Sequence, residues 1–180
     1  MAKLNVNDEL PDFQFTTPYE ANLSIKDKIN EATKTAIIFL RYFGCPVCQL
    51  DLHDLAKNYD DITKEGGQLF VVLQSDPVTL KEKIADYKFP YTIICDPEQS
   101  LYQEFNIEPA GSMAKMADAK TMVKVAKATA KGYKHGDYEG NELQLPAAFV
   151  VDNNGILTYV HYGKGAGDIP DAKEIKELLK

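Results

Sequence analysis

The stretch that decides the fold is TAIIFLRYFGCPVC, residues 35–48. Its first part is a continuous apolar run, rich in β-branched residues and closed by Arg41, which predicts a strand buried on both faces of a sheet. Two cysteines follow at once, and Pro46 between them suits the first position of a helix. That helix is predicted to run to about Glu65, where Gly66-Gly67 stops it.

The two cysteines hold different places on this helix. Cys48 opens an apolar stripe with spacings of four, three, four and three residues, so it is expected to face the core. The later members of the stripe are Leu52, Leu55, Tyr59 and Ile62. Cys45 lies at the helix mouth, where unpaired N–H donors and about half a positive charge favour a thiolate. We therefore predict that Cys45 is the nucleophile and that Cys48 resolves its product as a disulfide.

Arg41 is the only arginine in the chain and lies just upstream of the motif. It would add positive potential if its side chain turned toward the cysteines.

A structural zinc site is the competing interpretation of the C-x-x-C motif. Zinc needs about four ligands, and no second C-x-x-C exists. The remaining candidates are Cys95, His53, His135 and His161. We expect no metal and no organic cofactor, since no Gly-rich nucleotide motif is present. Cys95 ends an apolar run and is expected to be a core residue, and the histidines at 135 and 161 are expected to be surface or hydrogen-bonding residues.

The remaining pattern predicts an α/β fold in which strands and helices alternate. The expected strands are 68–74, 91–95, 147–151 and 156–162, and the expected further helices are 77–87, 98–105, 111–131 and 171–180. Residues 1–34 are loop-rich, with a hairpin or edge strand near Phe13-Gln14-Phe15. We find no repeat and no second domain, so residues 1–180 are expected to form a single domain.

A helical segment and a polar loop, together about residues 111–145, precede the last hairpin. The helix 111–131 is expected to pack against the core with its lysines in water; a lid or a partner surface is the alternative. Its candidate core residues are Met113, Met116, Val123 and Ala130. Between 111 and 140 six lysines oppose three acidic residues, a local charge of +3 that could steer an acidic reductant. The loop 132–145 is long enough to be mobile or functional.

Composition narrows the class of protein further. The net charge is 20 − 27 = −7, which disfavours nucleic acid as a partner. No apolar stretch approaches the ~20 residues needed to span a bilayer, and no secretory signal begins the chain. We expect a soluble, cytoplasmic protein without a membrane partner, and a homodimer is possible.

Several segments resemble the peroxiredoxin-like branch of the AhpC/TSA superfamily. The active-site segment of that branch is similar to residues 39–48, and its DPE turn is similar to residues 96–102. Its late strand and hairpin are similar to residues 143–155, and its C-terminal signature to residues 161–170. The match spans roughly residues 8–180.

The resemblance implies a thioredoxin-like, three-layer α/β/α fold with a central mixed sheet and a peroxiredoxin-type N-terminal extension. It also implies a cis peptide bond at Leu145-Pro146, beside the cysteine pair. The implied activity is that of a thiol-dependent oxidoreductase, which cycles Cys45–Cys48 while it reduces peroxides or protein disulfides and is recycled by a thioredoxin-like reductant. A redox-sensing or partner-binding module without efficient turnover is the alternative.

Two departures from the family pattern concern the cysteines. Typical peroxiredoxins carry a threonine three residues before the peroxidatic cysteine and a distant arginine. If Cys48 is aligned with that cysteine, Cys45 takes the place of the threonine, and no second arginine exists. The alignment thus favours Cys48 as the nucleophile, whereas the helix position favours Cys45. The departures favour dithiol–disulfide exchange, or a slower or differently built peroxidase.

Overall fold

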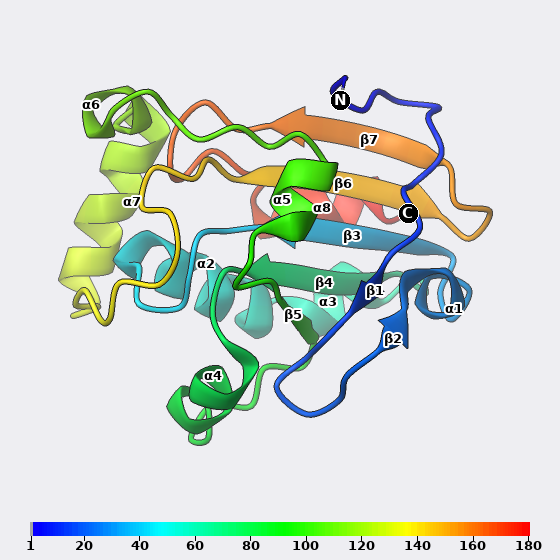
Figure 1. The fold of residues 1–180 in the computed structure, drawn as a ribbon, viewed down its shortest axis with the longest axis horizontal. Coiled ribbons are helices and arrows are strands. Elements are labelled where there is room, and N and C mark those ends of the chain that lie inside the picture. The colour runs from blue at the N-terminus through cyan, green and yellow to red at the C-terminus, as the bar shows by residue number, and fades with distance from the viewer. Residues whose placement is uncertain (1) are drawn as a thin grey trace.

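A five-stranded mixed sheet lies between two layers of helices in the computed structural model, which describes residues 2–180 (Figure 1). The strands are β3 (Lys34–Phe39), β4 (Gln68–Leu73), β5 (Thr92–Cys95), β6 (Ala147–Asp152) and β7 (Leu157–Tyr162). Their order is β5-β4-β3-β6-β7. β3, β4 and β5 run parallel, whereas β6 and β7 pair antiparallel. The predicted thioredoxin-like α/β/α architecture with a mixed central sheet is confirmed.

β3 is the central strand, and its sequence explains why. Successive side chains of a strand point to opposite faces of the sheet. Ala36 and Ile38 enter one apolar cluster, and Ile37 and Phe39 enter the other. All four are at most 1% exposed. The apolar run therefore forms a strand buried on both faces, as predicted.

The helices divide between the two faces of the sheet. α2 (Pro46–Lys57), α3 (Tyr59–Thr63), α4 (Pro77–Lys83) and α8 (Ala172–Leu178) contribute to the cluster that contains the cysteine pair. α1 (Ile25–Ile29) and α5 (Ser100–Glu104) cover the other face. The N-terminal extension adds a small hairpin of β1 (Gln14–Phe15) and β2 (Leu23–Ser24) on that second face (Figure 1). The hairpin was predicted, but α1 was not.

The helix predicted from the cysteines to Glu65 is broken into two. α2 ends at Lys57 and α3 begins at Tyr59, because Asn58 leaves the helical region with φ −103° and ψ 8°. Its side-chain amide donates to the carbonyl oxygen of Asp54 at 2.7 Å. An asparagine that bonds to its own backbone in this way competes with helix continuation.

The helix predicted over residues 111–131 is also two helices. They are α6 (Met113–Met116) and α7 (Ala119–Ala130), which meet at Asp118. The Asp118 carboxylate accepts a hydrogen bond from the N–H of Thr121 at 2.7 Å and so caps a new helix rather than continuing the old one. The helical insertion before the last hairpin is therefore present, in two segments.

The predicted orientation of this insertion is wrong. Met116 is buried as expected, but Met113, Val123 and Ala130 are exposed. The reason lies in the surface that α7 covers. α7 packs on α2, whose outer side carries two carboxylates, Asp51 and Asp54. Lys124 of α7 pairs with Asp51, and Lys131 at the end of the helix pairs with Asp54, so the side of α7 that carries Lys124 faces α2 and the apolar side chains face outward.

The candidate site lies where β3 leads into α2, at the end of the sheet over which α6 and α7 stand (Figure 1). Within residues 2–180, no helix combines the length and the apolar character needed to cross a bilayer.

Candidate active site

Cys45 occupies the N-cap position of α2. Its backbone is extended, with φ −74° and ψ 122°, and Pro46 follows in the first turn, where its missing N–H costs no hydrogen bond. The Cys45 sulfur accepts a hydrogen bond from the N–H of Cys48 at 3.4 Å. The thiol thus takes the role that a serine or aspartate takes at most helix N-termini. Such a position stabilises negative charge on the sulfur.

Arg41 lies directly against this sulfur. Its Nη2 is 2.9 Å from Cys45 Sγ, and its Nη1 donates to the carbonyl oxygen of Glu142 at 2.6 Å. The side chain is largely buried, and its Nε has no hydrogen-bond partner among the described residues. Burial lowers the pKa of the guanidinium, but the attraction of Cys45 and Cys48 outweighs burial and raises it above its ordinary value. The arginine is therefore a fixed positive charge beside the thiol.

The pKa values of the two cysteines move in opposite directions. A hydrogen bond from the Cys48 side chain, opposed by burial and assisted by Arg41, lowers the pKa of Cys45 to about 6. Burial, with the hydrogen bond and charge of Cys45, raises the pKa of Cys48 well above its ordinary value. At neutral pH the pair therefore consists of a Cys45 thiolate and a Cys48 thiol. All three cysteines of the chain are unpaired in this structure.

A strap formed by residues 132–145 closes over the pair. The N–H of Gly136 donates to the Gly44 carbonyl at 2.8 Å, and the Tyr42 hydroxyl lies 3.2 Å from Nε2 of His135. The backbones at Gly44 and the strap approach so closely that a Cβ at Gly44 would collide with the carbonyl oxygen of Asp137. Both cysteines also belong to the apolar cluster on this face of the sheet, and Cys45 is 0% exposed and Cys48 1% exposed.

The far end of the strap is tied to the end of β4. The side chain of Gln74 both accepts from the N–H of Asn141 at 2.7 Å and donates to its carbonyl at 3.4 Å. Glu139 accepts from the Ser75 hydroxyl and from Lys83, each at 2.8 Å. These contacts were not predicted, because they join positions more than 50 residues apart. Only the length of the loop signalled a functional segment.

Four of the five predicted site residues meet at one place: Cys45, Cys48, Arg41 and Pro46. Pro146 directly precedes β6, whose first residue, Ala147, pairs with Phe39 at the end of β3. No peptide bond between residues 2 and 180 is cis, so the cis bond expected at Leu145-Pro146 is wrong. The carbonyl of Pro146 accepts from the N–H of Gly163 at 2.9 Å and so extends the β6–β7 pairing. The trans bond is the ordinary isomer for a proline that leads into a strand.

The other candidate ligands lie apart from one another. Cys95 is buried at the end of β5, where burial raises its pKa to about 12. His53 stacks on Tyr133 with ring centroids 5.3 Å apart, and His161 lies 3.2 Å from Asp168. Among residues 2–180, no three or more Cys, His, Asp and Glu side chains are arranged to hold a metal ion.

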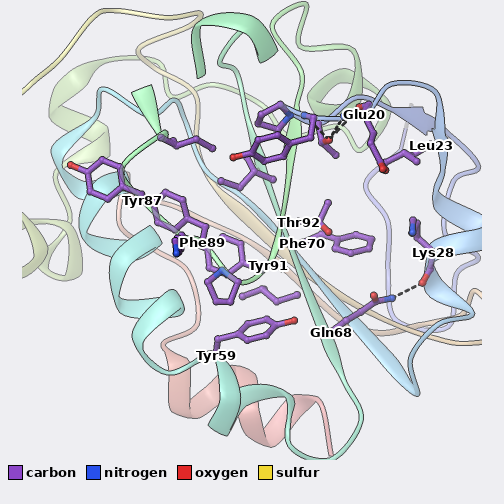
Figure 2. Close-up of a pocket in the computed structure, with 18 of the residues that line it drawn as sticks. Glu20, Leu23, Lys28, Tyr59, Gln68, Phe70, Tyr87, Phe89, Tyr91 and Thr92 are labelled. Atoms are coloured by element: carbon purple, nitrogen blue, oxygen red, sulfur yellow. Dashed lines mark hydrogen bonds between the residues drawn. The ribbon is translucent and has the colours of Figure 1, made fainter. Parts of the chain in front are cut away.

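A surface groove of about 620 Å³ lies elsewhere on the molecule (Figure 2). Figure 2 shows the rings of Tyr59, Phe89 and Tyr91 along it, with Glu20 and Lys28 on the opposite side. None of the predicted site residues lines this groove. The reactive chemistry is at the closed cysteine pair, which we take as the candidate active site.

The fold and the paired cysteines at the start of α2 define a thioredoxin-fold protein of thiol-dependent redox type. The chain belongs to the AhpC/TSA family, whose model matches residues 6–160.

Several known proteins are similar to this chain in sequence or in fold. Prostamide/prostaglandin F synthase of Salmo salar is 27% identical over 147 residues, which cover 79% of this chain and 72% of that protein. Two solved structures share the fold. A mutant of peroxiredoxin 6 of Arenicola marina has a TM-score of 0.72 at 17% identity, over 98% of this chain and 72% of the other. Peroxidoxin BcpB of Mycobacterium tuberculosis has a TM-score of 0.69 at 10% identity, over 97% and 95%.

Proposed function

We propose that this protein is a thiol peroxidase that cycles Cys45 and Cys48 between dithiol and disulfide. The observation that carries the proposal is the environment of Cys45, whose sulfur is held by Arg41 at 2.9 Å and by the first turn of α2. Both contacts favour the thiolate, which is the reactive form of a cysteine. Cys48 lies one helical turn away and remains a thiol, as a resolving cysteine should before it reacts.

The proposed chemistry has two steps. The Cys45 thiolate attacks one peroxide oxygen, the O–O bond breaks, and the leaving oxygen takes a proton to become water or an alcohol. Cys45 is then a sulfenic acid. Cys48 attacks the Cys45 sulfur, the S–O bond breaks, and hydroxide leaves with the Cys48 proton as water. The products are an intramolecular disulfide, an alcohol or water, and water.

Closure of the site favours a small oxidant over a protein disulfide. Cys45 has no exposed surface beneath the strap, so a second protein cannot bring a disulfide to it in this conformation. A hydroperoxide needs only a path for a few atoms. Arg41 would serve as a donor to the peroxide oxygens in place of the threonine that typical peroxiredoxins carry.

The test is stopped-flow oxidation of the fully reduced protein by hydrogen peroxide, with free thiols counted afterwards. We expect rapid loss of two thiols per chain. Cys45→Ser should slow this oxidation by at least about 100-fold, because the activated thiolate is gone. Cys48→Ser should retain the fast first step but stop at a sulfenic acid.

Cys95→Ser is the matched control, since Cys95 is buried and holds its proton. It should leave the rate and the loss of two thiols unchanged. Oxidation of the wild-type protein at the rate of an ordinary free thiol would refute the peroxidase. Adding a bulky organic hydroperoxide to the series shows whether the closed site selects by size.

A redox sensor is the second candidate, and the strap is the observation that favours it. The strap bonds directly to the backbone of Gly44 and to the Arg41 guanidinium, so a disulfide at Cys45 removes the negative charge that Arg41 faces. The strap would then loosen and change a partner contact. Limited proteolysis of oxidised and reduced protein tests this candidate, and identical cleavage within residues 132–145 in both states would rule it out.

A further inference from the structure

Exposed apolar side chains concentrate in the helical insertion. Nine large apolar side chains are exposed among the described residues, and five of them lie between positions 113 and 138. The five are Met113, Met122, Val123, Val125 and Tyr138. Folded monomers seldom gather exposed apolar side chains in one region unless another molecule uses it.

The outward side of α7 forms the centre of this region, and we call it the insertion face. It consists of Met122, Val123, Val125, Ala126 and Ala130, all of which are exposed. At about 100° per residue these positions share one side of the helix. The opposite side is polar, and it is the side that packs on α2. The helix is therefore oriented as if its apolar side belonged to an interface.

The insertion that carries this face has positive charge that is unpaired within residues 2–180. Three lysines of the insertion are tied to acidic groups of the same chain: Lys120 to Asp168, Lys124 to Asp51 and Lys131 to Asp54. Three others have no ion-pair partner among the described residues and are exposed. These are Lys115, Lys127 and Lys134. We call these three lysines, which belong to the same insertion as the apolar face, the basic rim; together they complement an acidic surface with an apolar centre.

The insertion face is continuous with the active site through the strap. The strap leaves the end of α7 at Gly132 and reaches the cysteine loop at Gly44, through the Gly136 contact. α7 also stands at the end of the molecule where β3 leads into α2 (Figure 1). A protein bound to the insertion face is thereby held beside the strap that it must displace to reach Cys45.

We propose that the insertion face is the docking surface for an acidic protein dithiol that reduces the Cys45–Cys48 disulfide; this rests on the proposed function. A second copy of this chain fits less well. A two-fold contact through this face would bring the basic rim against itself, and like charges at an interface oppose association.

The reduction balances without another reagent. A thiolate of the partner attacks one sulfur of the Cys45–Cys48 disulfide, and that S–S bond breaks as an intermolecular disulfide forms. The second partner thiol attacks this disulfide and releases the chain. The partner ends as a disulfide, and Cys45 and Cys48 regain two electrons and two protons.

The experiment compares two reductants of the oxidised protein. One is an acidic thioredoxin kept reduced by its reductase, and the other is dithiothreitol, which needs no docking surface. The variant is Met122→Glu/Val123→Glu, in which both replaced side chains are 55% exposed. The matched control is Val78→Glu on α4, where the side chain is 68% exposed.

With thioredoxin, we expect the double variant to raise KM at least about tenfold. Added salt should raise the wild-type KM as it screens the basic rim. With dithiothreitol the variant should match the wild type, and Val78→Glu should match it with both reductants.

Several outcomes would overturn the docking surface. The first is a double variant whose KM for thioredoxin is unchanged, and the second is a double variant that is recycled equally slowly by both reductants. The third is a wild-type protein that is recycled by dithiothreitol but not by thioredoxin. The last is a wild-type dimer that the double variant abolishes. That last outcome would show that the insertion face binds a second copy of this chain. If dithiothreitol fails to regenerate two thiols even in the wild type, the proposed function itself fails and takes the docking surface with it.

Discussion

α2 and α7 are helices of equal length, twelve residues each, that pack against one another. They differ in which side is buried: the apolar side in α2 and the polar side in α7. α2 buries its apolar residues in the main core, including Leu52 at 0% exposure. α7 exposes Met122 and Val123 and buries little more than Thr121 and Ala128. An amphipathic pattern thus defines a helix and its two sides, but the surface against which the helix packs decides which side is inside.

The contact between these helices contains a buried ion pair. Lys124 Nζ lies 2.6 Å from Oδ1 of Asp51, with both side chains largely buried. Oδ2 of Asp51 has no hydrogen-bond partner among residues 2–180. Burial raises the pKa of Asp51 to about 6 even though Lys124 acts to lower it. The pair therefore fixes α7 in its inverted orientation and is also costly to break.

Removal of Lys124 is the strongest test of this explanation. Lys124→Met leaves the Asp51 carboxylate buried without a counter-charge, and breaking a buried pair in this way costs about 3–5 kcal/mol. We expect that loss in the free energy of unfolding by urea at pH 7. The double variant Asp51→Asn/Lys124→Met should recover most of it. If the double variant is as unstable as the single one, packing rather than charge orients α7.

Truncation on the apolar side of each helix should separate their roles. Leu52→Ala creates a cavity beneath α2 and should lower the free energy of unfolding by about 3 kcal/mol. Met122→Ala removes a side chain of similar size from α7 and should change it by less than about 0.5 kcal/mol, because the residue is 55% exposed. Equal losses in the two variants would mean that the insertion face is covered within the chain itself.

The sequence predicted the buried side of α2 better than that of α7, because the surface against which each helix packs differs. The stripe from Cys48 through Leu52 and Leu55 packs on a sheet that is itself apolar, so pattern and environment agree. The side of α7 that packs on α2 instead carries Lys124, which pairs with Asp51, 73 residues earlier in the chain, and no local pattern reveals that neighbour. The contacts of the strap could not be predicted for the same reason, since Arg41 and Glu142 come together only in the folded chain.

The cysteine junction was predictable because it is encoded locally. A buried strand, a proline at the first turn and two cysteines one turn apart define the N-cap placement of Cys45 without long-range information. The direction of the Arg41 side chain was left open by the sequence, and the structure turns it toward the sulfur. The trans bond at Pro146 corrects an expectation that came from family resemblance rather than from local sequence.

The pH dependence of stability provides a further test of the buried pair. Asp51 has a pKa of about 6 in the folded protein, against an ordinary value of 3.8 that applies to the unfolded chain. The folded state therefore holds the proton of this carboxyl group more tightly than the unfolded state. Its contribution to stability is therefore full below about pH 4 and falls by about 3 kcal/mol as pH rises through 6. We expect the difference in unfolding free energy between wild type and Asp51→Asn to show that slope between pH 4 and 6. A flat difference would show that Asp51 is solvated when folded.

The smallest expected effect concerns the polar end of α2. Arg41→Gln removes the guanidinium from Cys45 but leaves the hydrogen bonds from Cys48, which are the larger cause of the lowered pKa. The pKa of Cys45 should therefore rise by about one unit, equivalent to about 1.4 kcal/mol, rather than return to its ordinary value. The ultraviolet absorbance of the thiolate between pH 4 and 9 measures it, since the pKa values of Cys48 and Cys95 lie above that range.

Lys88→Gln is the control for that titration, because it also removes one positive charge but from an exposed position that lines the separate groove. This variant should leave the pKa of Cys45 unchanged. If Arg41→Gln behaves like this control, the helix terminus and Cys48 alone hold the thiolate, and Arg41 then acts on the strap, through the Glu142 carbonyl, rather than on the sulfur. If Arg41→Gln shifts the titration as expected, one side chain links both regions: it stabilises the thiolate at the start of α2 and holds closed the strap that leads back to α7.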